Sequence, residues 1–250
     1  MISYCLWYHD SAKIENPAWY NCRMSFLQHV RRFFFENSLT IVLLTLFLVF
    51  LIGLSITGWM EQNNELATHD QPAQDYLSYI VSGEFGEAVF ENWESEFLQM
   101  WALVMLTIVL RQKGSADSKK LEGKSKVDVP SRYSIIRSRN WNDRRKAVGE
   151  FFTAHSLGLA LLSIFIVAFI LHAITGVAAY NNEQLQHGLP EVSIWEYIAS
   201  SRFWFESFQN WQSEFLAVGV LLLLSVFLFE RGSPESKPVG ESREKTGGGA

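Results

Sequence analysis

Cysteine is scarce in this 250-residue chain, which has only Cys5 and Cys22, both before the first apolar segment. The two form no even set at scaffold spacing and no Cys-x-x-Cys pair, which excludes a disulfide framework and a thiolate zinc site. The sequence also lacks a phosphate-binding glycine loop, a His-Glu-x-x-His pair and a nucleophile elbow. We therefore expect a protein that is not an enzyme and that has no cofactor.

Charge is nearly absent from four windows, although 19% of the chain is charged and 48% is hydrophobic. About 20 apolar residues are enough to cross roughly 30 Å of hydrocarbon. The composition therefore predicts an all-α membrane protein with four transmembrane helices, not a soluble core. The predicted spans cover residues 38–60, 89–110, 156–178 and 208–229.

The pattern N-W-x-S-E-F-L occurs twice, at 92–98 and at 210–216. The offset of 118 positions aligns roughly 34 identical residues among about 89, polar ones included, which indicates a tandem duplication of a helical hairpin. Met24 is a candidate start, which would place 1–23 outside the native protein. The predicted parts are an N-terminal extension (1–30), repeat 1 (31–119), a basic linker (120–148), repeat 2 (149–237) and a disordered tail (238–250).

Lysine and arginine are almost missing from the two loops that join paired spans, where only Arg202 occurs. The other 20 of the 21 basic residues lie in the N-terminal segment, the central linker and the tail. Basic residues mark the cytoplasmic side of a membrane protein, so both termini and the linker are predicted to be cytoplasmic. Both repeats then insert the same way, and we expect a pseudo-two-fold axis along the membrane normal.

The second and fourth spans are short, which is a mark of a binding site in membrane proteins. Phe97 to Leu110 supplies only about 14 apolar residues, or ~21 Å of helix. Extending the span brings polar side chains into the membrane, where a carboxylate needs a partner, a proton or water. The alternative is capping and anchoring at headgroup level. The candidate residues are Asn92, Trp93, Ser95, Glu96, Asn210, Trp211, Ser213 and Glu214.

His172 is the only ionisable residue deep inside an apolar span, and its counterpart in repeat 1 is Leu54. Ionisable groups at such depth usually have a function, which makes His172 a further candidate. The alternative is a histidine that is hydrogen-bonded to a neighbouring helix.

Two acidic–histidine pairs recur at a spacing of four residues, Glu65 with His69 and Glu183 with His187. On a helix this spacing presents two metal ligands on one face. The alternative is a solvated loop, because a proline follows each pair closely.

The central linker interleaves apolar residues with basic ones, as in segments that lie on anionic lipid headgroups. A nucleic-acid partner is not expected, since the linker is tethered between two spans. The candidate lipid-facing residues are Arg137, Arg139, Arg144 and Arg145.

The doubled N-W-x-S-E-F-L, the N-N-E-Q-L-x-H stretch at 181–187 and the R-G-S-P-E-S-K-P stretch at 231–238 give the chain a resemblance to a known family. It resembles uncharacterised bacterial integral membrane proteins that are catalogued as a domain of unknown function. The resemblance covers about residues 31–240 and implies four spans in a bacterial cytoplasmic (inner) membrane. It implies no activity and no site residue.

Two functions fit these features. The first is a small cation or proton channel or transporter with Glu96 and Glu214 as its sites, which we expect to need a homo-oligomer because one four-helix bundle has little room for a pore. The second is a non-catalytic membrane-organising or partner-binding protein that acts through its basic linker and aromatic outer loops.

Overall fold

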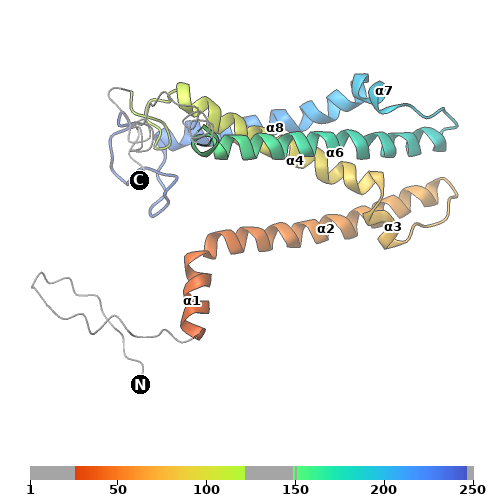
Figure 1. Ribbon diagram of the computed structural model, residues 1–250, viewed down its shortest axis with the longest axis horizontal. Helices are drawn as coiled ribbons and strands as arrows, with labels where there is room; N and C mark the ends of the chain where they lie inside the picture. Colours follow the sequence, from red (N-terminus) through yellow and green to blue (C-terminus); the bar gives the residue numbers. More distant parts are fainter. Residues whose placement is uncertain (1–25, 122–148, 150, 247–250) are drawn as a thin grey trace, which may run out of the picture. The chain divides into compact units, whose positions relative to one another are not determined.

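The computed structural model describes residues 26–121, 149 and 151–246, and the regular elements in these ranges are all helices, as predicted (Figure 1). The helices are α1 (Phe26–Glu36), α2 (Ser38–Thr68), α3 (Tyr76–Ile80), α4 (Gly83–Val109), α6 (Ser156–Gln186), α7 (Ile194–Ala199) and α8 (Ser201–Phe227).

The chain divides into two compact units, 1–57 and 58–250. The first unit contains α1 and most of α2, whose apolar side chains such as Leu43, Phe50 and Ile52 are more than half exposed. The second unit contains the end of α2 and all later helices. The candidate site lies wholly in the second unit.

The helices of the second and fourth predicted spans begin several residues earlier than the apolar windows. α4 starts at Gly83 because the Ser82 hydroxyl caps it, accepting a hydrogen bond from the Phe85 amide at 3.4 Å. Ser200 caps α8 in the same way, through the amide of Phe203. Each helix has 27 residues, about 40 Å, which is long enough to cross a membrane.

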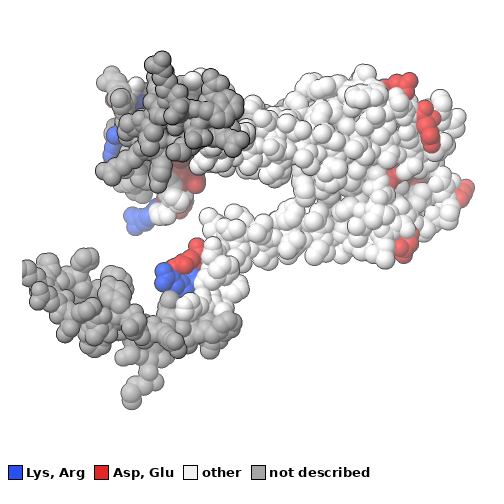
Figure 2. All heavy atoms as spheres, in the orientation of Figure 1, with Lys and Arg blue, Asp and Glu red and all other residues white. Residues whose placement is uncertain are grey.

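Three helices are long and apolar enough to span a membrane, namely α2, α6 and α8. Only 6%, 22% and 6% of their most apolar windows are buried inside the protein, so most of this surface requires lipid. On the face shown in Figure 2, the surface of α6 and α8 between their ends carries no charged side chain. Three of the four predicted apolar spans are therefore confirmed as candidate spans. The second, in α4, is not among them, because glutamates interrupt the first half of that helix.

α4 is the central helix of the second unit, packing most extensively along α6 and to a lesser extent against α8 (Figure 1). Glycine allows the close approach: a Cβ on Gly83 would lie 2.7 Å from the backbone nitrogen of Ala179. At Gly86 it would lie 2.4 Å from the Thr175 methyl group. The first turn of α4 is thus pressed against the C-terminal half of α6.

The two repeats share local structure that explains several of their identical residues. In repeat 1 the Asn63 side chain holds the backbone of Gln74 through two hydrogen bonds, at 2.6 and 3.2 Å. In repeat 2, Asn181 holds Val192 in the same way, at 2.8 and 3.0 Å. These asparagines therefore fix the loops that follow α2 and α6.

Equivalent residues of the two repeats lie beside each other at three levels of the second unit. The rings of His69 and His187 are 6.2 Å apart at one end. The carboxylate of Glu96 is an electrostatic neighbour of Glu214, and that of Asp117 is a neighbour of Glu235 at the other end. These three pairs bring matching positions of the two repeats together, and the pseudo-two-fold axis stays a prediction.

The tail after α8 forms turns that contact the segment after α4. Lys237 is almost fully buried, and its ammonium group donates to the carbonyls of Ser242 and Arg243. The Thr246 hydroxyl accepts a hydrogen bond from the Gly114 amide at 2.8 Å. The end predicted to be disordered is therefore described as far as residue 246, with buried contacts.

Candidate functional site

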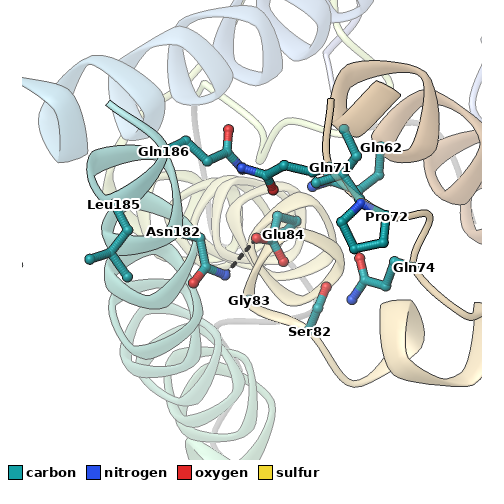
Figure 3. Close-up of a pocket in the computed structure, with 11 residues that line it drawn as sticks. Gln62, Gln71, Pro72, Gln74, Ser82, Gly83, Glu84, Asn182, Leu185 and Gln186 are labelled. Atoms are coloured by element: carbon teal, nitrogen blue, oxygen red, sulfur yellow. Dashed lines mark hydrogen bonds between the residues drawn. The ribbon is translucent and has the colours of Figure 1, made fainter. Parts of the chain in front are cut away.

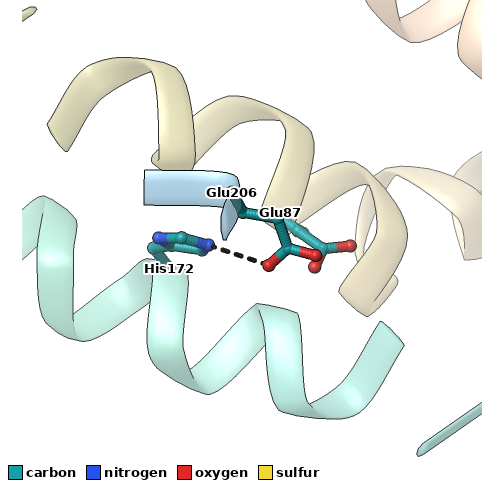
Figure 4. A group of neighbouring side chains, drawn as sticks. All are labelled: Glu87, His172 and Glu206. Carbon is teal, nitrogen blue, oxygen red and sulfur yellow. Dashed lines mark ion pairs between the residues drawn. The ribbon is translucent and has the colours of Figure 1, made fainter. Parts of the chain in front are cut away.

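His172 is fully buried in α6 and faces a carboxylate at each of its ring nitrogens. Its Nδ1 lies 2.9 Å from a carboxylate oxygen of Glu94, and its Nε2 lies 3.7 Å from one of Glu206 (Figure 4). The ring of Phe203 stacks on the imidazole, with centroids 4.9 Å apart. The two carboxylates thus hold the histidine in one orientation, and the Phe203 ring covers one face of the imidazole.

α4 supplies three carboxylates, which lie on one face of the helix in consecutive turns. Glu87, Glu91 and Glu94 follow the i, i+4, i+7 spacing that aligns side chains on one helix face. Glu94 is fully buried, and the indole of Trp211 donates a hydrogen bond to it at 3.0 Å. The amide of Asn210 donates to Glu91, also at 3.0 Å. α8 therefore holds this acidic face through the repeated Asn-Trp pair.

Tyr197 in α7 connects the carboxylates of two helices. Its hydroxyl is 2.7 Å from Glu206 and 3.2 Å from Glu87, and it donates to one of them at a time. Burial, followed by the hydrogen bond to Glu206, raises the pKa of the Tyr197 phenol. The phenol is positioned by Gly176, where a Cβ would lie 2.4 Å from the hydroxyl oxygen. Tyr197 therefore stays a neutral donor between the two acids.

Negative groups outnumber positive ones in this part of the protein. We call Glu87, Glu91, Glu94, His172 and Glu206 the His172 cluster. The described cation beside it is Arg202, which is half exposed and pairs with Glu206 and Glu183. Four carboxylates with one histidine and one arginine leave excess negative charge, and burying it is costly unless protons or a cation neutralise it.

A pocket of about 530 Å³ lies next to the start of α4 (Figure 3). Its wall contains Glu84, one turn before Glu87, which accepts a hydrogen bond from the Asn182 amide at 2.7 Å. Most other polar groups around it are amides, and its described lining contains no lysine or arginine. The lining residues are Gln62, Leu66, Gln71, Pro72, Gln74, Ser82, Gly83, Glu84, Asn182, Leu185 and Gln186.

The predicted site residues lie in different places. His172 belongs to the cluster, and the motif residues Asn210 and Trp211 donate hydrogen bonds to its acids. Glu96 is exposed and forms a separate acidic pair with the half-buried Glu214.

The remaining motif residues mostly serve their own helix. The Asn92 amide donates to the Ala88 carbonyl, and Trp93 stacks edge-on with Phe90. The hydroxyls of Ser95 and Ser213 donate to the backbone carbonyls three residues earlier. Ser95 is nevertheless buried beside Glu94, so it borders the cluster.

The four residues predicted as metal ligands are exposed and lie at the C-terminal ends of α2 and α6 or directly after them. His69 and His187 lie beside each other, whereas Glu183 pairs with Arg202 at 3.8 Å and Glu65 lies on the exposed side of α2. Metal binding there stays a prediction. The candidate lipid-facing arginines, Arg137, Arg139, Arg144 and Arg145, lie outside the described residues.

Sequence reasoning predicts His172 but none of the four glutamates of the cluster, because it follows the identities between repeats. The cluster is built largely where the repeats differ, and each acid or histidine has an uncharged counterpart. A search for charged residues at differing positions would find all five. The pairs are Glu87 with Phe205, Glu91 with Gln209, Glu94 with Gln212, Glu206 with Ala88, and His172 with Leu54.

Long apolar helices with lipid-exposed surfaces, joined around a buried acidic–histidine cluster, are those of a multi-pass membrane protein. The chain belongs to the family described as domain of unknown function DUF6766, whose model matches residues 30–248. No curated protein and no solved structure matches the chain.

Proposed function

We propose that the protein is a small channel or transporter for protons or another small cation, with the His172 cluster as its ion site. The observation that carries this proposal is the fully buried imidazole with a carboxylate at each ring nitrogen. Imidazole can accept a proton on one nitrogen and release a proton from the other. Histidine changes its charge between about pH 5 and 8 in its unperturbed form. Such a group between two acids suits transfer of a proton through a helix bundle.

The polar side chains around His172 form a series that leads toward the pocket. Glu84 lines the pocket one turn before Glu87. From Glu87 the series continues through the Tyr197 hydroxyl to Glu206, and then to His172 and Glu94. His172 is the seventeenth residue of α6, about 24 Å from the start of that helix. The cluster therefore belongs to the outer part of the membrane.

The inner half of the route is mostly apolar. Beyond Glu94, the buried polar residues of α4 are Ser95 and Gln99, and about 15 Å of apolar helix follows to Val109. This length favours alternating access or a route completed by a second copy of the chain. We expect native mass measurement in mild detergent to show a homo-oligomer. A monomer alone would exclude a route that is completed by a second copy of the chain.

The membrane arrangement that supports this function has α4 as a fourth span. Its Glu91 and Glu94 face α8 and α6, so most of its remaining surface can meet lipid. Both termini lie in the cytoplasm by the distribution of lysine and arginine, and the membrane is the bacterial cytoplasmic one. The protein is not an enzyme in this account, and its partners are the bilayer and anionic headgroups.

The test is proton flux into proteoliposomes under a pH gradient, comparing wild type with His172→Gln. The matched control is His155→Gln, a histidine at the exposed beginning of the same helix. We expect His172→Gln to lower flux at least about tenfold, because a positioned proton-transfer group contributes that much or more. His155→Gln keeps the wild-type rate.

Folding is checked by size-exclusion profile and thermal unfolding of each purified variant. Equal flux in wild type, His172→Gln and empty liposomes, with all proteins folded, would remove the proposal.

A further inference from the structure

We infer that Glu87, His172 and Glu206 form a binding site for one divalent transition-metal ion of the zinc or manganese(II) class. The three residues come from α4, α6 and α8, and one ligand atom of each lies within 4.8 Å of the others (Figure 4). Among the described residues, this is where three such side chains converge.

The free nitrogen of His172 gives independent support. Nε2 is buried, and none of the described residues forms a hydrogen bond with it. Its 3.7 Å separation from Glu206 is too long for a hydrogen bond. It is close to the separation of about 3.4 Å between two ligand atoms that bind a tetrahedral zinc ion at 2.0–2.1 Å. Binding a metal would satisfy this nitrogen with a small movement of the carboxylates.

The surroundings are those of residues that orient metal ligands. A histidine ligand usually gives its other ring N–H to a carboxylate, as His172 Nδ1 does with Glu94 at 2.9 Å. Trp211 fixes Glu94 in turn, and the Tyr197 hydroxyl holds Glu206 and Glu87. Arg202 pairs with Oε1 of Glu206. Oε2, the oxygen nearest His172, accepts the Tyr197 hydroxyl and has a second lone pair for a metal.

The ligand set narrows the kind of ion. One imidazole with two carboxylates suits zinc, manganese(II) or iron(II), whereas calcium and magnesium prefer oxygen ligands alone. The set contains no thiolate or thioether, which disfavours copper(I). The acidic, amide-lined pocket at Glu84 offers a cation an approach from the outer end.

This inference rests on the proposed function, because the same cluster would bind the ion that it carries. Metal binding is nevertheless measured at equilibrium in detergent, without any flux. A 1:1 metal complex in a protein that passes no ion would keep the inference and remove the proposed function. Proton flux in a protein that binds no metal would do the reverse.

The experiment titrates the chelator-stripped full chain with Co²⁺, whose visible absorption reports ligand number and geometry, and then displaces it with Zn²⁺. We expect one saturable site per chain. Glu87→Gln and His172→Gln should each weaken metal binding at least tenfold. Tyr197 positions the ligands without touching the metal, so Tyr197→Phe should weaken binding by about 10–100-fold. The matched controls Glu191→Gln and His155→Gln, both exposed, should bind as wild type does.

Exposed histidines are the main source of adventitious binding, so the titration is repeated with His69→Asn and His187→Asn combined. The cobalt spectrum should persist in this variant. Loss of the spectrum there, or its survival in Glu87→Gln and His172→Gln, would overturn the inference. So would the absence of saturable binding in folded wild-type protein.

Discussion

Tyr197 and Tyr79 show how the repeats use one residue in two ways. Each hydroxyl packs on the glycine of an Ile-Thr-Gly sequence, Gly176 or Gly58, at the same position of its repeat. Tyr197 then reaches Glu87 and Glu206, whereas the counterparts of those acids on the side of Tyr79 are Phe205 and Ala88. The same scaffold therefore carries a polar site in one half only.

At this scale we predict that Tyr197→Phe destabilises the protein and Tyr79→Phe does so far less. Removing the hydroxyl leaves two half-buried carboxylates without their shared donor, which costs about 1–2 kcal/mol. Both variants keep the ring and its packing on glycine. Unfolding in detergent measures the difference, and equal losses in the two variants would contradict the role given to the Tyr197 hydroxyl.

Some residues of the site can be predicted from the sequence and others cannot. His172 can be singled out because it is an ionisable residue in an apolar window, and Asn210 and Trp211 because their motif is repeated. Glu87 and Glu206 cannot, because they sit at the polar beginnings of α4 and α8, where glutamate is ordinary. Only the packing of three helices brings them to the histidine.

Among the elements, α4 depends on glycine where it meets α6. Gly83→Ala places a methyl group 2.7 Å from backbone that cannot move aside, and we expect a loss of about 1–3 kcal/mol. Gly219→Ala is the control, because no atom lies within 4 Å of its added Cβ. There alanine should be neutral or stabilising by up to about 1 kcal/mol, through helix propensity.

Thermal unfolding of the two glycine variants in the same detergent measures this difference. A Gly83→Ala protein as stable as Gly219→Ala would show that α4 and α6 are not in close contact.

The short helix α7 carries Tyr197 and depends on its capping box. Hydrogen bonds from the backbone and side chain of Ser193 lower the pKa of Glu196 from its ordinary value of 4.5. The cap therefore contributes stability above that value and loses it as pH falls through the lower pKa of the folded state. We expect the α7 amides to exchange faster in acid, once the intrinsic pH effect is removed.

Ser193→Ala should remove most of this pH dependence of the α7 amides, since it takes away the hydroxyl of the box. Hydrogen exchange followed by mass spectrometry measures it. An unchanged pH profile in the variant would contradict the prediction that the capping box stabilises α7.

At the scale of the molecule, the helical class, the repeat and three of the four spans follow from the sequence. Long charge-free windows report contact with lipid directly, and identities at a fixed offset report duplication. The status of α4 does not follow, because its glutamates lower its hydropathy, and the sequence does not show that Glu94 is buried against α6 and α8. The helix starts also escape prediction, since serine caps extend α4 and α8 beyond their apolar windows.

The topology makes a separate prediction for the whole chain. In a background without Cys5 and Cys22, a cysteine replacing the exposed Glu191 should react with a membrane-impermeant maleimide in intact cells. One replacing the exposed Lys120 should react only after permeabilisation. Labelling of Lys120→Cys in intact cells would reverse the assigned orientation.

The most direct test of the account compares two glutamates of α8, one inside the His172 cluster and one in the acidic pair with Glu96. Proton flux in proteoliposomes is measured for Glu206→Gln and for Glu214→Gln combined with Glu96→Gln. The account predicts a loss of at least about tenfold in Glu206→Gln and near wild-type flux in the double variant. Flux that survives in Glu206→Gln and disappears in the double variant would contradict it and assign transport to the repeated motif.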